Sequence, residues 1–263
     1  LLFFACLIAW VLSPIWGELS TSIIGDPRTD AIRGMWGLDH LRHSVLDGSL
    51  LQTMRVHFPT GAYALVLPLG TGLIGVVLGV LLGPVITWNL TIAVVLWGTA
   101  MGVAWLTKCL TECWLPGLLA GSIVIAQPML HHGLADGTIE HVALWGVPLF
   151  LGAAILALQE QSVRWGLAAG GLSILVAIDS PYNAVYALVI GVLVLPWQLK
   201  WVRGRQRDLG LTLGAMGLMA IAGAAVVAWL LHPVALAQGD TATAALQGSN
   251  ATDIRLWWRY TGT

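Results

Sequence analysis

The chain has 263 residues, of which 57% are hydrophobic and only 10% are charged, and its formal net charge is -1. A soluble core of this length would carry far more charge, so the composition excludes a soluble globular domain and indicates a polytopic helical membrane protein. The near-zero net charge also excludes a nucleic-acid partner, because proteins that bind nucleic acid carry a basic footprint.

The first apolar run covers residues 1–16 and is slightly shorter than the roughly 20 residues that a membrane span needs. It starts at Leu1 without a Met, and it lacks the basic region and the small-residue cleavage site of a signal peptide. We therefore interpret it as a clipped membrane span. Because the sequence also stops in a polar stretch at Thr263, we expect the chain to be a fragment of a longer protein.

Residues 17–61 are predicted to form an outer loop that contains an interfacial helix. Pro27 stops any helix that would run through the loop, and Thr29 or Asp30 can cap the next one. We expect this helix to have about four or five turns and to end near Gly48.

The interfacial helix is expected to have two distinct faces. Its apolar stripe has helical spacing and would lie flat on the membrane surface. The stripe consists of Ile32, Met35, Trp36, Leu41 and Val45. The opposite row consists of Asp30, Arg33, Gly37, His40 and Ser44. This polar row would face the molecules that bind at the membrane surface.

The remaining sequence alternates apolar segments with short polar turns. The apolar segments cover residues 62–82, 85–107, 114–130, 140–158, 165–179, 183–199 and 209–231. The first of these is broken by Pro68 and the glycines that follow it into halves too short to cross separately, so it is predicted to be re-entrant. Residues 232–263 are predicted to be a final outer loop that the end of the sequence truncates.

The predicted fold is thus all-α: a polytopic membrane helical bundle with about seven transmembrane helices, one interfacial amphipathic helix and one re-entrant segment. Residues 1–263 form a single transmembrane module. If segment 62–82 re-enters, Lys108, Arg164 and the basic run 200–207 lie inside, and all seven His residues lie outside. If it crosses fully and the chain is inverted, ten of the twelve Lys and Arg residues lie inside. The charge count alone favours the second topology, whereas the break at Pro68 favours the first.

Several short motifs follow one another along the chain in a characteristic order. They are Gly25–Asp30 with Arg33–Gly37, Phe58–Gly61, Gly83–Pro84 with Trp88–Leu90, Gly137–His141 with Trp145–Leu149, and Ser180–Tyr182. Together they resemble the multi-pass glycosyltransferases of the GT-C type, which use polyprenyl-phosphate sugars as donors. The resemblance covers nearly the whole chain and favours the first topology. It implies that the chain is the N-terminal transmembrane module that members of that superfamily share.

The resemblance implies a site at the outer face of a bacterial-type plasma membrane, where a sugar passes from the polyprenyl-phosphate donor to a lipid, glycan or protein acceptor. Asp26 or Asp30 would be the general base that takes the proton of the acceptor hydroxyl. Arg33 would bind the donor phosphate, since guanidinium presents a bidentate fork, and Arg28 is the reserve candidate. The plain alternative is that both acids only cap a helix or a turn.

A second polar cluster, residues 131–141, is expected on the same face. Glu140 and His141 would complete the pocket and orient the sugar hydroxyls or a divalent ion, and His57 is a further substrate-binding candidate. The alternative is a capped helix start, because an acid is favoured at a helix N-terminus. The oxygen ligands suit Mg²⁺ or Mn²⁺, but no recognisable ligand spacing appears, so the sequence establishes no cofactor.

Two further features bear on function. Asp179 is the only other acid close to membrane depth, which makes it a functional candidate unless it simply reaches water at the end of its helix. The rival to a transferase is a non-catalytic polytopic protein, either a transporter or flippase of lipid-linked sugars or an assembly subunit. A transporter would show paired broken helices in two related halves, and the sequence has one broken segment and no evident internal repeat.

Overall fold

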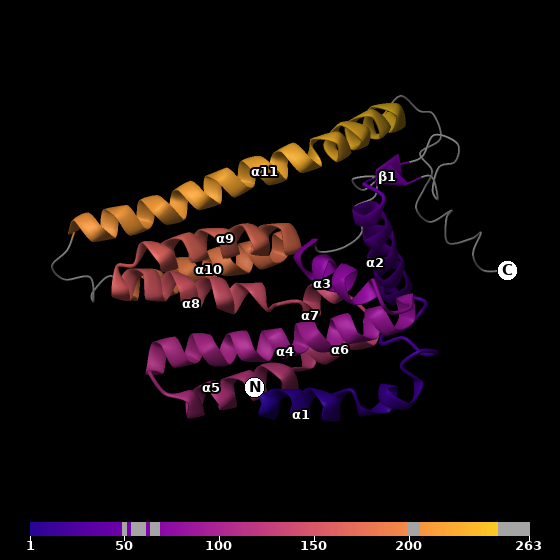
Figure 1. Cartoon of the computed structure of the whole chain (residues 1–263), viewed down its shortest axis with the longest axis horizontal. Coiled ribbons are helices and arrows are strands. Elements are labelled where there is room, and N and C mark those ends of the chain that lie inside the picture. The colour runs from indigo at the N-terminus through magenta and orange to yellow at the C-terminus, as the bar shows by residue number, and fades with distance from the viewer. Residues whose placement is uncertain (49–51, 54–61, 64–68, 199–205, 247–263) are drawn as a thin grey trace.

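The computed structural model describes residues 1–48, 52–53, 62–63, 69–198 and 206–246 (Figure 1). Apart from one antiparallel pair of two-residue strands, β1 (Gln52–Thr53) and β2 (Ala62–Tyr63), its regular elements are helices. In chain order the helices are α1 (Leu2–Val11), the short 3-10 helix η1 (Ser13–Glu18), α2 (Asp30–Leu46), α3 (Leu69–Gly79), α4 (Pro84–Thr111), α5 (Trp114–Ala126), α6 (Pro128–Asp136), α7 (Ile139–Val142), α8 (Gly146–Glu160), α9 (Val163–Asp179), α10 (Pro181–Gln198) and α11 (Gln206–Leu246).

The long helices run along the longest axis of the molecule, and α2 stands across one end of them (Figure 1). Helix α4 begins at this end and leads away from it, α5 and α6 return, and α8, α9, α10 and α11 continue the alternation. The end that carries α2 is called the polar end below, since residues 25–30 and 131–141 also lie there. Lys108 is 20 residues beyond Trp88 on α4, so it lies about 30 Å away, toward the opposite end.

Three helices are long and apolar enough to cross a membrane: Pro84–Thr111, Ile139–Glu160 and Asp208–Val226. The pair α5 and α6 passes the same test but bends by 46° at its break, so the described residues offer three or four spans. The expectation of about seven spans is not met by this measure. Helices α1 and α9 have only 10 and 17 residues, fewer than the roughly 20 that a hydrocarbon core of about 30 Å requires.

Helix α4 is the centre of the packing. Its buried side chains, including Trp88, Ile92 and Leu96, form one cluster with residues of α1, α2 and α5–α7. Small residues let neighbouring backbones approach closely, as membrane helices require. A Cβ at Gly117 or Gly121 of α5 would lie 2.5 Å or 2.7 Å from a backbone carbonyl of α4, so these positions need glycine.

The outer surface of the bundle is strongly apolar. Only 6% of the candidate span of α11 is buried inside the protein, against 67% for the span that contains α8. Leu211, Leu218 and Ile221 of α11 are each more than half exposed. Such an uncovered apolar surface would be a liability in water and is the natural surface of a protein in lipid.

Segment 62–82 differs in detail from the expected broken span. Described residues 69–79 form one short helix, α3, which starts directly after Pro68 instead of breaking at the glycines. The helices before and after the segment meet at the polar end, where Gly34 of α2 packs against Trp88 of α4. A sharp bend occurs instead between α5 and α6, at Pro128, which lacks the backbone N–H that would continue the helix.

Helix α2 has the expected length and start but not the expected faces. Its buried residues are Ala31, Gly34, Gly37, Leu38, His40, Leu41 and Ser44. Ile32 and Val45 of the predicted apolar stripe are 41% and 51% exposed, whereas His40 and Ser44 of the predicted polar row are buried. The reason is that α2 packs against α4 through Gly34 and against α3 through Leu38 and Leu41, which lie on glycines of α3, so protein contacts and not hydropathy alone orient the helix.

Candidate functional site

The two polar segments that the sequence singles out meet at the polar end. The backbone N–H of Asp26 donates to the carbonyl of Ala135 at 2.7 Å. The hydroxyl of Thr29 lies 2.5 Å from the carbonyl of Asp136, and that of Thr138 donates to Oδ2 of Asp30 at 3.4 Å. The prediction that both segments share one face of the molecule is therefore consistent with their contacts.

Two glycines make this contact close. Gly25 and Gly137 have φ angles of +105° and +71°, in the left-handed region that favours glycine. A Cβ on Gly25 would lie 2.7 Å from Cα of Gly137 and 2.9 Å from Cβ of Ala31. Any side chain at Gly25 would thus force the loop away from both the second cluster and the start of α2.

The expected cap of α2 has another role. Thr29 occupies the N-cap position, but its hydroxyl makes no capping bond to a helix N–H. It instead faces the carbonyls of Asp26 and Asp136, at 2.8 Å and 2.5 Å. Thr29 therefore ties the loop to the second cluster, which sequence reasoning missed because a Thr before a helix usually caps it.

Asp26 is already engaged with its neighbour. Its carboxylate accepts hydrogen bonds from the backbone N–H of Arg28 at 2.8 Å, from Nε at 3.2 Å and from Nη2 at 3.1 Å. The Arg28 side chain holds the pKa of the Asp26 carboxyl below its ordinary value. A carboxylate with a lowered pKa is a weaker base, so Asp26 is better suited to shaping the loop than to taking a proton.

Asp30 and Arg33 form the other exposed pair. Nη1 of Arg33 lies 3.7 Å from Oδ1 of Asp30, and the two side chains are 63% and 52% exposed. This separation is long for a hydrogen bond, so both groups remain available to a ligand. The carboxylate and the guanidinium lie one turn apart at the start of α2, as the sequence predicts.

Glu140 and His141 lie on α7, directly after Thr138, and both are half-buried. They are expected to complete the same site from the second cluster, and the contact between Thr138 and Asp30 brings their helix to the edge of α2. His132, also in the cluster, pairs with Asp136 at 3.2 Å between Nε2 and Oδ2. His57 lies outside the described residues.

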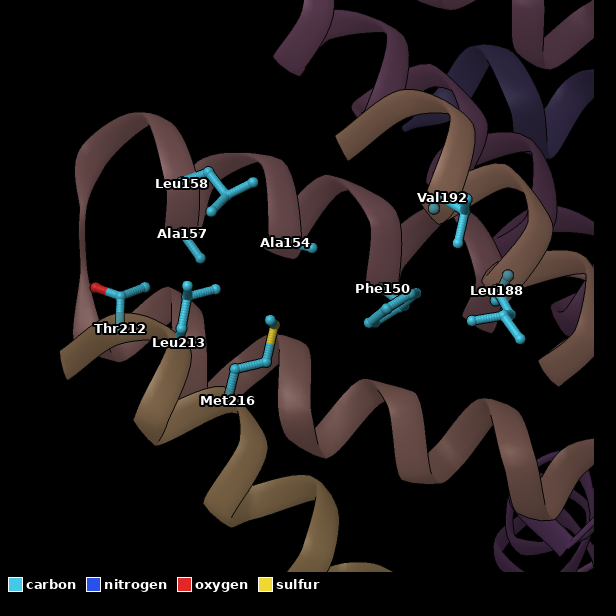
Figure 2. A pocket seen from close by; sticks show the side chains of 11 residues that line it. Phe150, Ala154, Ala157, Leu158, Leu188, Val192, Thr212, Leu213 and Met216 are labelled. Carbon is cyan, nitrogen blue, oxygen red and sulfur yellow. The ribbon is translucent and has the colours of Figure 1, made fainter. Parts of the chain in front are cut away.

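In the described part of the chain, no three His, Cys, Asp or Glu side chains come together in a way that could hold a metal ion. A cavity of about 410 Å³ lies elsewhere, between α8, α10 and α11 (Figure 2). Its lining includes Phe150, Ala154, Leu188 and Met216 and offers no acid or base. It contains none of the predicted site residues, so the chemistry is better placed at the polar end.

Among the residues whose burial is described, one acid is buried. Asp179, the last residue of α9, is only 4% exposed, and its carboxylate accepts hydrogen bonds from the backbone N–H and the hydroxyl of Thr71. The alternative that Asp179 simply reaches water is therefore wrong. No family model, curated protein or solved structure matches this chain.

Proposed function

We propose that the chain is the N-terminal transmembrane module of a GT-C-type glycosyltransferase, which moves a sugar from a polyprenyl-phosphate donor to a lipid, glycan or protein acceptor. The observation that carries the proposal is the contact between residues 25–30 and 135–138. It places the loop and the start of α2, which carry Asp26, Arg28, Asp30 and Arg33, beside residues 135–138 at one end of an apolar bundle. A lipid phosphate at the membrane surface would reach this position.

Asp30 is the proposed base. In the transfer, the acceptor hydroxyl attacks C1 of the sugar and gives its proton to the carboxylate of Asp30. The bond between C1 and the phosphate oxygen breaks, and the phosphate leaves with the electron pair. Asp26 is less suitable because three hydrogen bonds from Arg28 already occupy its carboxylate.

Arg33 is proposed to offset the charge that develops on the leaving phosphate, because its planar fork can bind two phosphate oxygens. It lies one turn from Asp30, so base and phosphate site would face the same sugar from neighbouring positions. Arg28 belongs to the loop itself, is 87% exposed and is the second candidate cation for the phosphate. Glu140 and His141 are proposed to bind the sugar hydroxyls.

The proposed membrane is a bacterial-type plasma membrane, with about seven crossings in total and the polar end facing outward. Lys108 and Arg164 lie at the ends of α4 and α9 that point away from α2. Basic residues favour the cytoplasmic side, so Lys108 and Arg164 fit this orientation, whereas Arg28 and Arg33 at the polar end count against it. Cysteines introduced at positions 26 and 164 would test it, since an impermeant reagent added from outside should label only the first.

The function is tested with the purified protein in nanodiscs and a panel of polyprenyl-phosphate sugars that carry labelled hexoses or pentoses. Asp30→Asn should abolish transfer, because Asn keeps the size of the side chain but cannot take a proton. Asp26→Asn should retain part of the activity. Asp47→Asn, at the exposed far end of α2, is the matched control and should transfer like wild type.

Activity that survives in Asp30→Asn would remove Asp30 as the base. If wild type transfers no sugar with any donor but moves the lipid-linked sugar across the bilayer of sealed liposomes, the rival assignment as a flippase would replace the transferase.

A further inference from the structure

The corner between α9 and α10 holds a buried polar network that the proposed reaction does not use. Asp179 accepts a hydrogen bond from the backbone N–H of Thr71 at 2.7 Å and another from its hydroxyl at 3.0 Å. Thr71 is fully buried, in the first turn of α3. A buried carboxylate is costly unless donors satisfy it, so these bonds hold α3 firmly against the end of α9.

The same network reaches the start of α8. Nε1 of Trp145 donates to the hydroxyl oxygen of Thr71 at 3.2 Å, so this hydroxyl donates to Asp179 and accepts from Trp145. Asn183, also buried and in the first turn of α10, donates to the carbonyl of Ala143 at 3.0 Å. Hydrogen bonds at this corner therefore hold α3 on one side and the junction between α7 and α8 on the other.

Helix α3 needs such partners because of its length. An 11-residue helix cannot cross the membrane, and its unpaired end groups would lie away from water. Asp179 satisfies the N–H of Thr71 at the start of α3, and Arg42 donates to the carbonyl of Gly79 at its end, at 2.9 Å. A negative charge at the start and a positive charge at the end also complement the helix dipole.

Helices α2 and α7, which carry the residues of the candidate site, both contact elements that this network holds in place. Leu38 and Leu41 of α2 pack directly onto Gly75 and Gly72 of α3, where a Cβ would collide with them. Helix α2 carries Asp30 at its start. Trp145 follows three residues after the end of α7, the helix that carries Glu140 and His141.

We propose that Asp179 is a positioning residue that clamps the start of α3 and thereby fixes the positions of α2 and α7 relative to each other at the site. It acts through Thr71 and Trp145 and does not touch substrate. The clamp itself is independent of the reaction, whereas its effect on transfer rests on the proposed function.

Hydrogen exchange of the protein in nanodiscs tests the clamp without any substrate. In Asp179→Asn, the peptide covering α3 should exchange about tenfold faster than in wild type, because a charge-assisted bond to its first turn is lost. Thr71→Val should have a similar effect, since the hydroxyl that joins Asp179 to Trp145 disappears. Thr91→Val is the matched control: Thr91 is equally buried, but its hydroxyl bonds only the carbonyl of Thr87 in its own helix.

The double variant of Asp179→Asn with Thr71→Val should exchange no faster than the faster single variant, because both changes break one network. Exchange in α3 that equals wild type in Asp179→Asn and in Thr71→Val would overturn the proposal. Should Asp179→Asn not fold, Thr71→Val and Thr71→Ser decide it, since Ser keeps the hydroxyl and should restore slow exchange. Where transfer is measured, Asp179→Asn should lower kcat more than it raises KM for the donor, and a protein without transferase activity would leave the exchange result standing.

Discussion

Two adjacent glycines in α9 allow a matched test of how α9 and α11 pack. A Cβ on Gly170 would lie 2.5 Å from the carbonyl oxygen of Met216 and 2.7 Å from Cβ of Met219, so α11 would have to move by about 1 Å to restore ordinary contact. A Cβ on Gly171 would meet nothing within 4 Å. Both glycines lie inside the same helix, so the gain of about 1 kcal/mol in helix propensity on changing Gly to Ala is common to both.

The difference between Gly170→Ala and Gly171→Ala therefore isolates the overpacking cost, which is about 1 to 3 kcal/mol. Gly171→Ala should be as stable as wild type or slightly more stable. Gly170→Ala should unfold at a temperature about 3 to 10 °C below Gly171→Ala. Tryptophan fluorescence during heating of the protein in nanodiscs measures both at one scan rate. Equal unfolding temperatures for the two variants would refute the packing of α11 on α9.

Three further changes probe the polar end. Arg28→Gln should raise the pKa of Asp26 toward its ordinary value of 3.8, as followed by carboxyl NMR; in wild type the favourable pairing is present above that value and is lost as the pH falls through the lowered pKa. Arg33→Lys should weaken binding of a polyprenyl-phosphate sugar by about 1 to 3 kcal/mol in neutral nanodiscs, and equal affinity would remove Arg33 from the phosphate site. Gly137→Ala should separate the two polar segments, because its φ of +71° is strained for Ala and its Cβ would collide with Ala31; faster exchange of the Asp26 amide would report the loss.

The sequence predicts helices well where apolar length and end signals agree. The expected segment 85–107 became α4, and the helix expected after Pro27 became α2, since Asp30 begins it and Asp47 follows its last residue. The segment expected at 140–158 lies within a candidate span, Ile139–Glu160, but this span divides into α7 and α8 at a break after Val142 that apolar composition does not signal. Hydropathy counts apolar residues but is blind to such local turns.

The faces of α2 could not be predicted for a different reason. In a membrane protein a polar residue can look toward water, lipid headgroups or another helix, and the sequence does not distinguish these cases. His40 is buried and stacks on Trp36, with ring centroids 5.2 Å apart, so it serves packing within the fold. The decisive signal was the glycines, since Gly34 admits Trp88 and Gly72 admits Leu41.

The motifs at the polar end divide into residues that assemble the site and residues that remain available for chemistry. Gly25, Thr29 and Gly137 make the contact between the two segments. The two glycines adopt positive φ angles there, and the hydroxyl of Thr29 faces two carbonyls. Asp30 and Arg33 form a long, exposed pair at 3.7 Å, and Asp30 also accepts a hydrogen bond of 3.4 Å from Thr138. A substitution in the first group should therefore change exchange and stability together with activity. A substitution in the second should change activity alone, and this separation is what distinguishes a catalytic site from a capped loop at the membrane surface.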